Sequence, residues 1–255
     1  LDSGAEAGSR AFGDLPRVQQ VVARSRRDRV LRKACPARRL AGVALGPIAA
    51  STLHCGRTEL MEDLDGGQPR DAGFEQPDGL KDLGIDFVST ANNHALDRGS
   101  VGADKTIDNM RAKGLAFAGT RRSTEDEKYY AVSEANGIRV GWVSCSFSTN
   151  GIPDKKKQVL LCYGDKAKVL DIVKTLPAKE RVDAVIVTPH WGNEYQNSPA
   201  AAEKALGREF LNAGATAVLG GHPHVLQPWE KVTMPDGEER FIIYSLGNFV
   251  SGQVS

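Results

Sequence analysis

The chain has 255 residues, of which 40% are hydrophobic and 25% charged, and its formal net charge is +1 at pH 7. This composition is typical of a globular domain with ample core, and the near-zero charge does not favour nucleic acid as a partner. No apolar run approaches the ~20 residues needed to cross a bilayer, and the polar opening LDSGAEAGSR shows no signal peptide or anchor. The four cysteines are scattered without a C-x-x-C pair, so we expect buried thiols, with a Cys35–Cys55 bridge as the alternative.

The first part of the chain differs in composition from the rest. Residues 1–70 hold eleven Arg and one Lys and lack clear strand patterns, and a Gly-, Asp- and Pro-rich stretch over 63–78 resembles a linker. From residue 80 onward, apolar runs alternate with helical patterns. We therefore expect one domain over 1–255 whose first 70 residues are atypical.

The regular part predicts strands and helices in alternation. Apolar runs predict strands at 85–88, 138–143, 182–187, 215–219 and 241–244. Helical spacing predicts a helix through Ala103 and Met110 that ends at Gly114, and another through Val169 and Val173 that Asp165 could cap. Ser198-Pro199 is expected to open a third helix, which ends at Gly214. Such alternation is typical of a layered α/β fold with a parallel or mixed sheet.

Four of the five histidines follow the ends of predicted strands. They are His94, His190, His222 and His224, and only His54 lies elsewhere. Ligands of open α/β sheets bind at the loops that leave the carboxyl ends of the strands. Any one of these histidines could be an ordinary buried side chain, but the shared placement favours a single site.

The stretch GGHPHV, residues 220–225, is built to present two imidazoles near one point. The proline removes a backbone donor and keeps the histidine before it out of helical conformation. The two glycines permit positive φ and close approach of the backbone. Neutral imidazole is the commonest protein ligand of transition metals, so this turn predicts a metal site.

Three further motifs supply polar groups to the same edge. ANNHALDRG offers amide oxygens at Asn92 and Asn93, and a His94 that could act as a general acid held in its tautomer by Asp97. The alternative for this motif is a polar turn. TPHWGNEY provides His190 as a ligand. Beside that histidine we expect Trp191 and Tyr195 as pocket walls and Glu194 as a further polar group, and the small residues of YSLGNF bring Asn248 near the rim. We expect these four residues and Asn92 to bind substrate.

The four motifs, in this order, resemble the CapA family of bacterial capsule and poly-γ-glutamate synthesis proteins, within the calcineurin-like metallophosphoesterases. The resemblance runs from about residue 74 to 253. It implies a four-layer α/β/β/α sandwich with mixed sheets and a metal centre at their loop edge. It also implies His94 as the proton donor, and as metal ligands Asn93, His190, His222 and His224.

The chain departs from the family in its carboxylate ligands. Gly13-Asp14 could be the first acidic motif, which would make Asp14 a ligand, but no strand precedes it. The family's second acidic motif corresponds to Val43-Ala44-Leu45-Gly46-Pro47, where its polar residues are missing. A bridging carboxylate offsets the repulsion between two neighbouring cations. We therefore expect one divalent ion (Mn, Fe or Zn) rather than two, with an empty centre as the third case.

The resemblance implies three functions. The first is metal-assisted hydrolysis or transfer at a phosphoester or amide-like bond, with an anionic polymer or phosphoester as substrate. The second is a metal-independent peptide epimerase that would use His94, Asp97 and a histidine of the 220–225 turn. The third is a non-catalytic accessory protein of a membrane polymer synthase. The family also suggests an extracytoplasmic, membrane-associated location.

Overall fold

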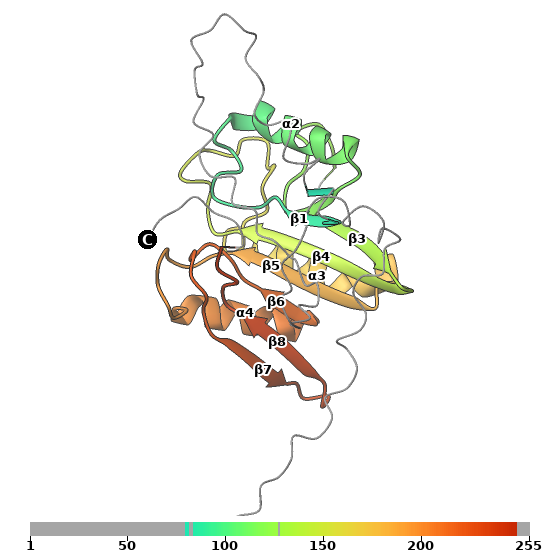
Figure 1. Cartoon of the computed structure of the whole chain (residues 1–255), viewed down its shortest axis with the longest axis vertical. Coiled ribbons are helices and arrows are strands. Elements are labelled where there is room, and N and C mark those ends of the chain that lie inside the picture. Colours follow the sequence, from blue (N-terminus) through green and yellow to red (C-terminus); the bar gives the residue numbers. More distant parts are fainter. Residues whose placement is uncertain (1–79, 82–83, 127, 249–255) are drawn as a thin grey trace, which may run out of the picture. The chain divides into compact units, whose positions relative to one another are not determined.

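The computed structural model describes residues 80–81, 84–126 and 128–248 (Figure 1). The expected ligand Asp14, His54, Cys35 and Cys55 lie outside these ranges. Within them the elements in chain order are β1 (Phe87–Ser89), α2 (Gly99–Ala112), β2 (Ala116–Ala118), β3 (Tyr130–Ala135), β4 (Ile138–Ser146), α3 (Lys166–Glu180), β5 (Ala184–His190), α4 (Ala201–Ala213), β6 (Ala217–Leu219), β7 (Trp229–Thr233) and β8 (Glu239–Ile243).

The helices lie where the helical spacing predicted them. Gly114 and Gly214 follow α2 and α4 with φ of 63° and 116°, the left-handed conformation that favours glycine. The start of α4 differs from the prediction. The helix begins at Ala201 instead of at Ser198-Pro199, and the Glu203 side chain accepts a 2.6 Å hydrogen bond from the backbone amide three residues before it. No helix in the described ranges has the length and apolar character to cross a membrane.

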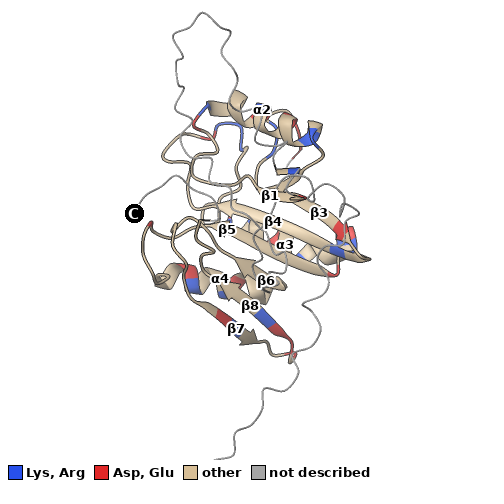
Figure 2. Cartoon of the chain, in the orientation of Figure 1, with Lys and Arg blue, Asp and Glu red and all other residues tan. Residues whose placement is uncertain are grey.

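The larger sheet has six strands in the order β3-β4-β5-β6-β8-β7. Its four inner strands are parallel, and the outer strands β3 and β7 run antiparallel to their neighbours. Figure 2 shows β4, β5 and β6 almost without charged residues along their length. Parallel strands read as apolar runs because both of their faces are covered.

The two faces of the larger sheet are covered by different layers. Phe87 of the short parallel sheet β1–β2 stacks on Trp142 of β4, with ring centroids 4.3 Å apart, and the next residue, Val88, packs with Leu115 on the α2 side. The opposite face of β4 lies against α3, so closely that a Cβ at Gly141 would come within 2.6 Å of a Leu176 methyl carbon. Helix α4 covers the same face (Figure 1). The predicted α/β/β/α order of layers is confirmed.

A disulfide corrects the expectation that the cysteines are free thiols. Cys145, near the end of β4, is bonded to Cys162, and both residues are fully buried. The backbone amide of Cys162 also donates a 2.8 Å hydrogen bond to the carbonyl of Ser146. Residues 146–162 therefore leave β4 and return to it as a closed loop. The sequence contains no pairing signal for these two cysteines, which lie outside the four motifs.

Reduction of this disulfide is expected to lower the free energy of unfolding by about 3 kcal/mol. A cross-link that closes a loop of this length reduces the conformational entropy of the unfolded chain, and it thereby stabilises the folded state by about that amount. Urea unfolding of the wild-type protein with and without reductant measures the difference. The Cys145→Ala/Cys162→Ala variant is the control, and its stability should not respond to reductant. A wild-type transition that reductant leaves unchanged would contradict the bond.

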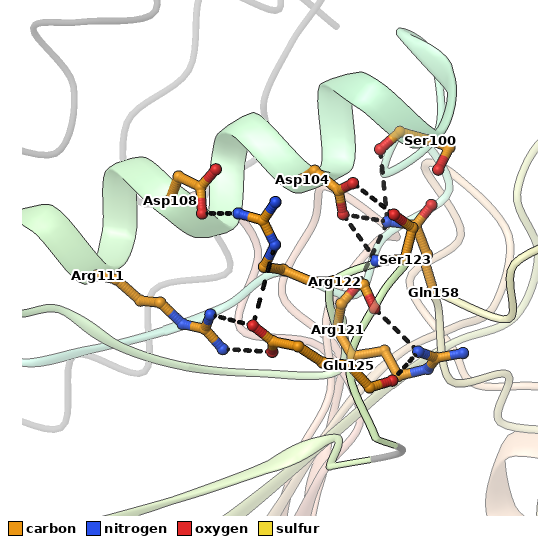
Figure 3. Close-up of polar contacts among 9 residues, drawn as sticks. All are labelled: Ser100, Asp104, Asp108, Arg111, Arg121, Arg122, Ser123, Glu125 and Gln158. Carbon is orange, nitrogen blue, oxygen red and sulfur yellow. Dashed lines mark hydrogen bonds and ion pairs between the residues drawn. The ribbon is translucent and has the colours of Figure 1, made fainter.

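A polar network fastens α2 to the segment that follows β2 (Figure 3). The carboxylate of Asp104 accepts hydrogen bonds of 2.8 and 2.6 Å from the amide and hydroxyl of Ser123, and one of 2.9 Å from Gln158. Burial raises the pKa of Asp104, but the Ser123 hydrogen bonds, the charge of Arg122 and the Gln158 amide lower it further, so the net shift is downward. The network fixes the helix that follows the ANNHALDRG motif.

Candidate metal centre

The parallel strands deliver the motif residues to one edge of the larger sheet. His190 is the last residue of β5, and the 220–225 turn follows β6 directly. The backbone amide of Trp191 donates a 3.0 Å hydrogen bond to the carbonyl of Gly221, which joins the two loops side by side. The edge is where the strand-end rule predicted a site.

The GGHPHV turn is strained at its histidines, not at its glycines. His222 and His224 have φ of 101° and 61°, a region that costs a non-glycine residue about 1–3 kcal/mol. Gly220 serves close approach instead, since a Cβ there would lie 2.0 Å from the carbonyl oxygen of Tyr244. The glycines, which would permit positive φ, do not take it here, and the left-handed residues are the ones that carry the imidazoles. Strain of this kind is typical of functional sites.

The 220–225 turn, the end of β5 and the loop after it bring three imidazoles and a carboxylate together. The ring centroids of His190 and His222 lie 4.7 Å apart, and those of His222 and His224 lie 5.8 Å apart. One ligand atom from each of Glu194, His222 and His224 lies within 4.8 Å of the other two. All three histidines are buried, whereas Glu194 is exposed and approaches from the solvent side. The Phe147 ring packs against the His222 ring in a tilted arrangement, with centroids 4.6 Å apart.

A second set of polar atoms extends from His190 to His94. His190 Nε2 lies 2.9 Å from Asn93 Oδ1, within hydrogen-bond distance, so that the two candidate ligand atoms are neighbours. The Asn93 amide group donates a 3.1 Å hydrogen bond to Asn150 Oδ1. His94 Nδ1 lies 2.8 Å from Asp97 Oδ2, as the ANNHALDRG spacing predicted. The side chain of His94 is 32% exposed, in contrast to the three buried histidines.

The other expected site residues divide between rim and core. Tyr195 is exposed and stacks 5.8 Å from His224, and Asn248 Oδ1 lies 2.8 Å from His224 Nδ1. Asn92 Oδ1 accepts a hydrogen bond from the backbone amide of His94, so it shapes the turn. Trp191 was expected to line a pocket, but it is fully buried among core aromatic rings and its indole donates to the Tyr244 carbonyl.

The chain was compared with known proteins. Residues 72–253 match the model of a family described as bacterial capsule synthesis protein PGA_cap. The chain belongs to this family. Among PGA_cap relatives, the capsule biosynthesis protein CapA of Bacillus anthracis is 32% identical over 203 residues, which cover 76% of this chain and 48% of the relative. The PGA biosynthesis protein CapA of Bacillus subtilis (strain 168) is 33% identical over 176 residues, which cover 68% and 44%. The chain thus spans about half the length of these relatives.

Solved structures also resemble this PGA_cap chain at low identity. The NAD nucleotidase of Haemophilus influenzae has a TM-score of 0.45 and 12% identity, with 67% of this chain and 36% of that chain covered. A putative 5'-nucleotidase of Staphylococcus aureus has a TM-score of 0.45 and 17% identity, with 70% and 36% covered.

The residues of this PGA_cap chain fit a divalent transition metal. Burial lowers the pKa of His222 to about 4. The charge of Glu194 opposes this shift by a smaller amount, and the neighbouring histidines add to it. His222 is therefore neutral at pH 7 and has a lone pair for an ion. Imidazole nitrogens, an amide oxygen and one carboxylate are the donors that Zn, Fe and Mn accept.

The candidate-ligand role of Glu194 and the place of Asn150 in the centre were not foreseen from the sequence. Glu194 was expected to contact substrate, but its carboxylate lies among the imidazoles of the turn and is a candidate ligand. Its spacing of four residues after His190 was the available signal. Asn150 lies in a loop outside the four motifs, and only the fold brings it to Asn93 and His94.

Proposed function

We propose that this chain holds a divalent metal ion at the β5–β6 edge and that the centre cleaves or transfers a phosphoester or amide-like bond in an anionic capsule polymer. The observation that carries the proposal is the gathering of the His190, His222 and His224 imidazoles with the Glu194 carboxylate. Membership of the PGA_cap family supports the capsule context, and the name of the Bacillus subtilis relative supports poly-γ-glutamate as the polymer.

The ion would be held by side chains on three loops and one strand end. The candidates are Asn93, His190, Glu194, His222 and His224. When bound, a divalent ion supplies Lewis acidity to a phosphoryl or acyl oxygen and acidifies water. Glu194 contributes the negative charge that the missing second acidic motif would otherwise provide. A single carboxylate in the described part of the site favours one ion over two.

His94 is suited to move the proton. Its Nδ1 faces the Asp97 carboxylate at 2.8 Å, which fixes the tautomer and the orientation of the ring. Nε2, on the other side of the ring, would donate a proton to the leaving group. The partial exposure of His94 gives a substrate access to it, whereas the buried histidines are reached only through the metal side. Tyr195 at the exposed rim would contact the polymer.

The proposal predicts metal-dependent turnover by the purified protein. The chelated protein is reloaded with Mn²⁺, Zn²⁺ or Fe²⁺ and assayed on p-nitrophenyl phosphate and on γ-glutamyl-p-nitroanilide. One ion is expected to restore hydrolysis of one substrate class, and chelator should abolish it. Turnover that is insensitive to chelator, with deuterium incorporation at a peptide Cα, would favour an epimerase. Absence of both bound ion and turnover would favour an accessory protein of a polymer synthase.

We also propose that the chain functions outside the cytoplasm. The buried Cys145–Cys162 bond supports this location, because structural disulfides persist in oxidising compartments. Maleimide labelling of denatured protein taken directly from cells, before and after reduction, locates the bond in its native compartment. Full reactivity of both cysteines before reduction would contradict the proposal.

A further inference from the structure

We propose that Asn150 is a positioning residue that orients the amide of Asn93 toward the metal centre, an inference that rests on the proposed metal site. Asn150 is outside the motifs that supply the candidate ligands. Its Oδ1 accepts a 3.1 Å hydrogen bond from Asn93 Nδ2, and its own Nδ2 lies 3.4 Å from His94 Nδ1. One side chain therefore contacts both a candidate ligand and the candidate proton donor.

The contact decides which end of the Asn93 amide faces His190. An asparagine side chain has a donor end and an acceptor end, and rotation about its last bond exchanges them. Because Asn150 accepts at Nδ2 of Asn93, the Oδ1 of Asn93 is turned toward His190 Nε2, 2.9 Å away. Only the oxygen can be a metal ligand. The flipped amide would present an NH₂ group to the ion.

The loop around Asn150 is held firmly enough for this task. The Cys145–Cys162 bond and the hydrogen bond from Cys162 to Ser146 close its ends, and the backbone amide of Phe147 donates a 2.8 Å bond to the His190 carbonyl. At the tip, the Thr149 hydroxyl donates a 2.7 Å bond to the carbonyl of Ile152. Outer residues that fix the orientation of a ligand in this way typically account for about 10- to 100-fold in metal affinity.

The chain contains a matched control for the backbone of Asn150. Asn150-Gly151 is a left-handed pair with φ of 52° and 76°, and Asn136-Gly137 is the same pair, with φ of 54° and 80°, in the hairpin between β3 and β4. That hairpin is at the start of β4, whereas Asn150 follows the end of β4. Substitution of either asparagine by glycine removes the amide without backbone strain, so both variants should fold.

The test compares Asn150→Gly with Asn136→Gly in two measurements. The first is calorimetric affinity for Zn²⁺ and Mn²⁺, which should fall about 10- to 100-fold in Asn150→Gly and stay at the wild-type value in Asn136→Gly. The second is a neutron crystal structure of metal-free Asn150→Gly, which distinguishes the amide oxygen from the amide nitrogen, and in which Asn93 Oδ1 should leave its position beside His190 Nε2. Thermal unfolding of the two variants should be similar.

The outcomes separate this inference from the proposed function. If the wild-type protein binds metal and Asn150→Gly binds it equally well, the positioning role is wrong and the metal site stands. If the wild-type protein binds no metal, the proposed function fails, and the crystal structure still decides whether Asn150 sets the Asn93 amide. An unchanged Asn93 in that structure would overturn the inference.

Discussion

Substitution of His94 by alanine is expected to lower kcat by about 10²- to 10⁴-fold, the usual contribution of a positioned general acid. The bound metal should stay in place, because His94 turns its Nδ1 toward Asp97 and lies outside the cluster of buried imidazoles. The measurement is steady-state turnover on the substrate that the wild-type protein hydrolyses, together with metal content by elemental analysis. Asp97→Asn should lower kcat less, by about 10- to 100-fold, because a neutral amide holds the tautomer and the orientation of the His94 ring less firmly than the carboxylate does.

His54→Ala is the control for this prediction, because His54 belongs to none of the four motifs. Its kcat should match that of the wild-type protein. A His94→Ala variant with wild-type kcat and full metal content would remove the proton-donor role. A variant that loses its metal would instead make His94 a ligand.

Removal of both histidines of the GGHPHV turn is expected to lower metal affinity by more than about 100-fold, because two direct ligands contribute more than an outer residue does. Substitution of the two histidines by glycine should also relieve backbone strain in the turn. His222 and His224 occupy the left-handed region, where a Cβ costs about 1–2 kcal/mol per residue. The His222→Gly/His224→Gly variant should therefore be more stable than His222→Ala/His224→Ala, by about 1 kcal/mol or more. Metal titration and urea unfolding of metal-free protein measure the two effects.

The order of the two variants is the informative part. Glycine normally destabilises a protein relative to alanine, because its unfolded chain has more freedom to lose. A glycine variant that is more stable and binds no metal would show that the turn holds its imidazoles at the expense of stability. If the alanine variant were the more stable, the left-handed geometry of the turn would be wrong. Affinity that survives in both variants would exclude the turn as the metal site.

Much of the fold could be predicted from the period of the apolar residues. The runs at 138–143, 182–187 and 215–219 correspond to inner strands of the larger sheet, and Gly114 and Gly214 end helices where expected. The site followed from one topological rule, which places the loops after parallel strands at the same edge. That rule brought His190 and the 220–225 turn together without any knowledge of distances.

The rest depended on contacts that leave no pattern in the chain. Nothing in the spacing of Cys145 and Cys162 predicts that they pair, because the loop between them has no regular period. Asn150 reaches Asn93 only through the path of that loop. Trp191 and Glu194 belong to one motif, yet the first is buried in the core and the second lies beside the imidazoles.

Side chains from loops that are distant in the sequence are expected to share one metal ion. A crystal structure of the protein loaded with Zn²⁺ or Mn²⁺, with anomalous diffraction recorded at the absorption edge of the ion, tests it most directly. We expect an anomalous peak about 2.1 Å from an imidazole nitrogen of both His222 and His224, with the Glu194 carboxylate or the Asn93–His190 pair completing the coordination. A fully loaded crystal whose peak lies away from these imidazoles would contradict it.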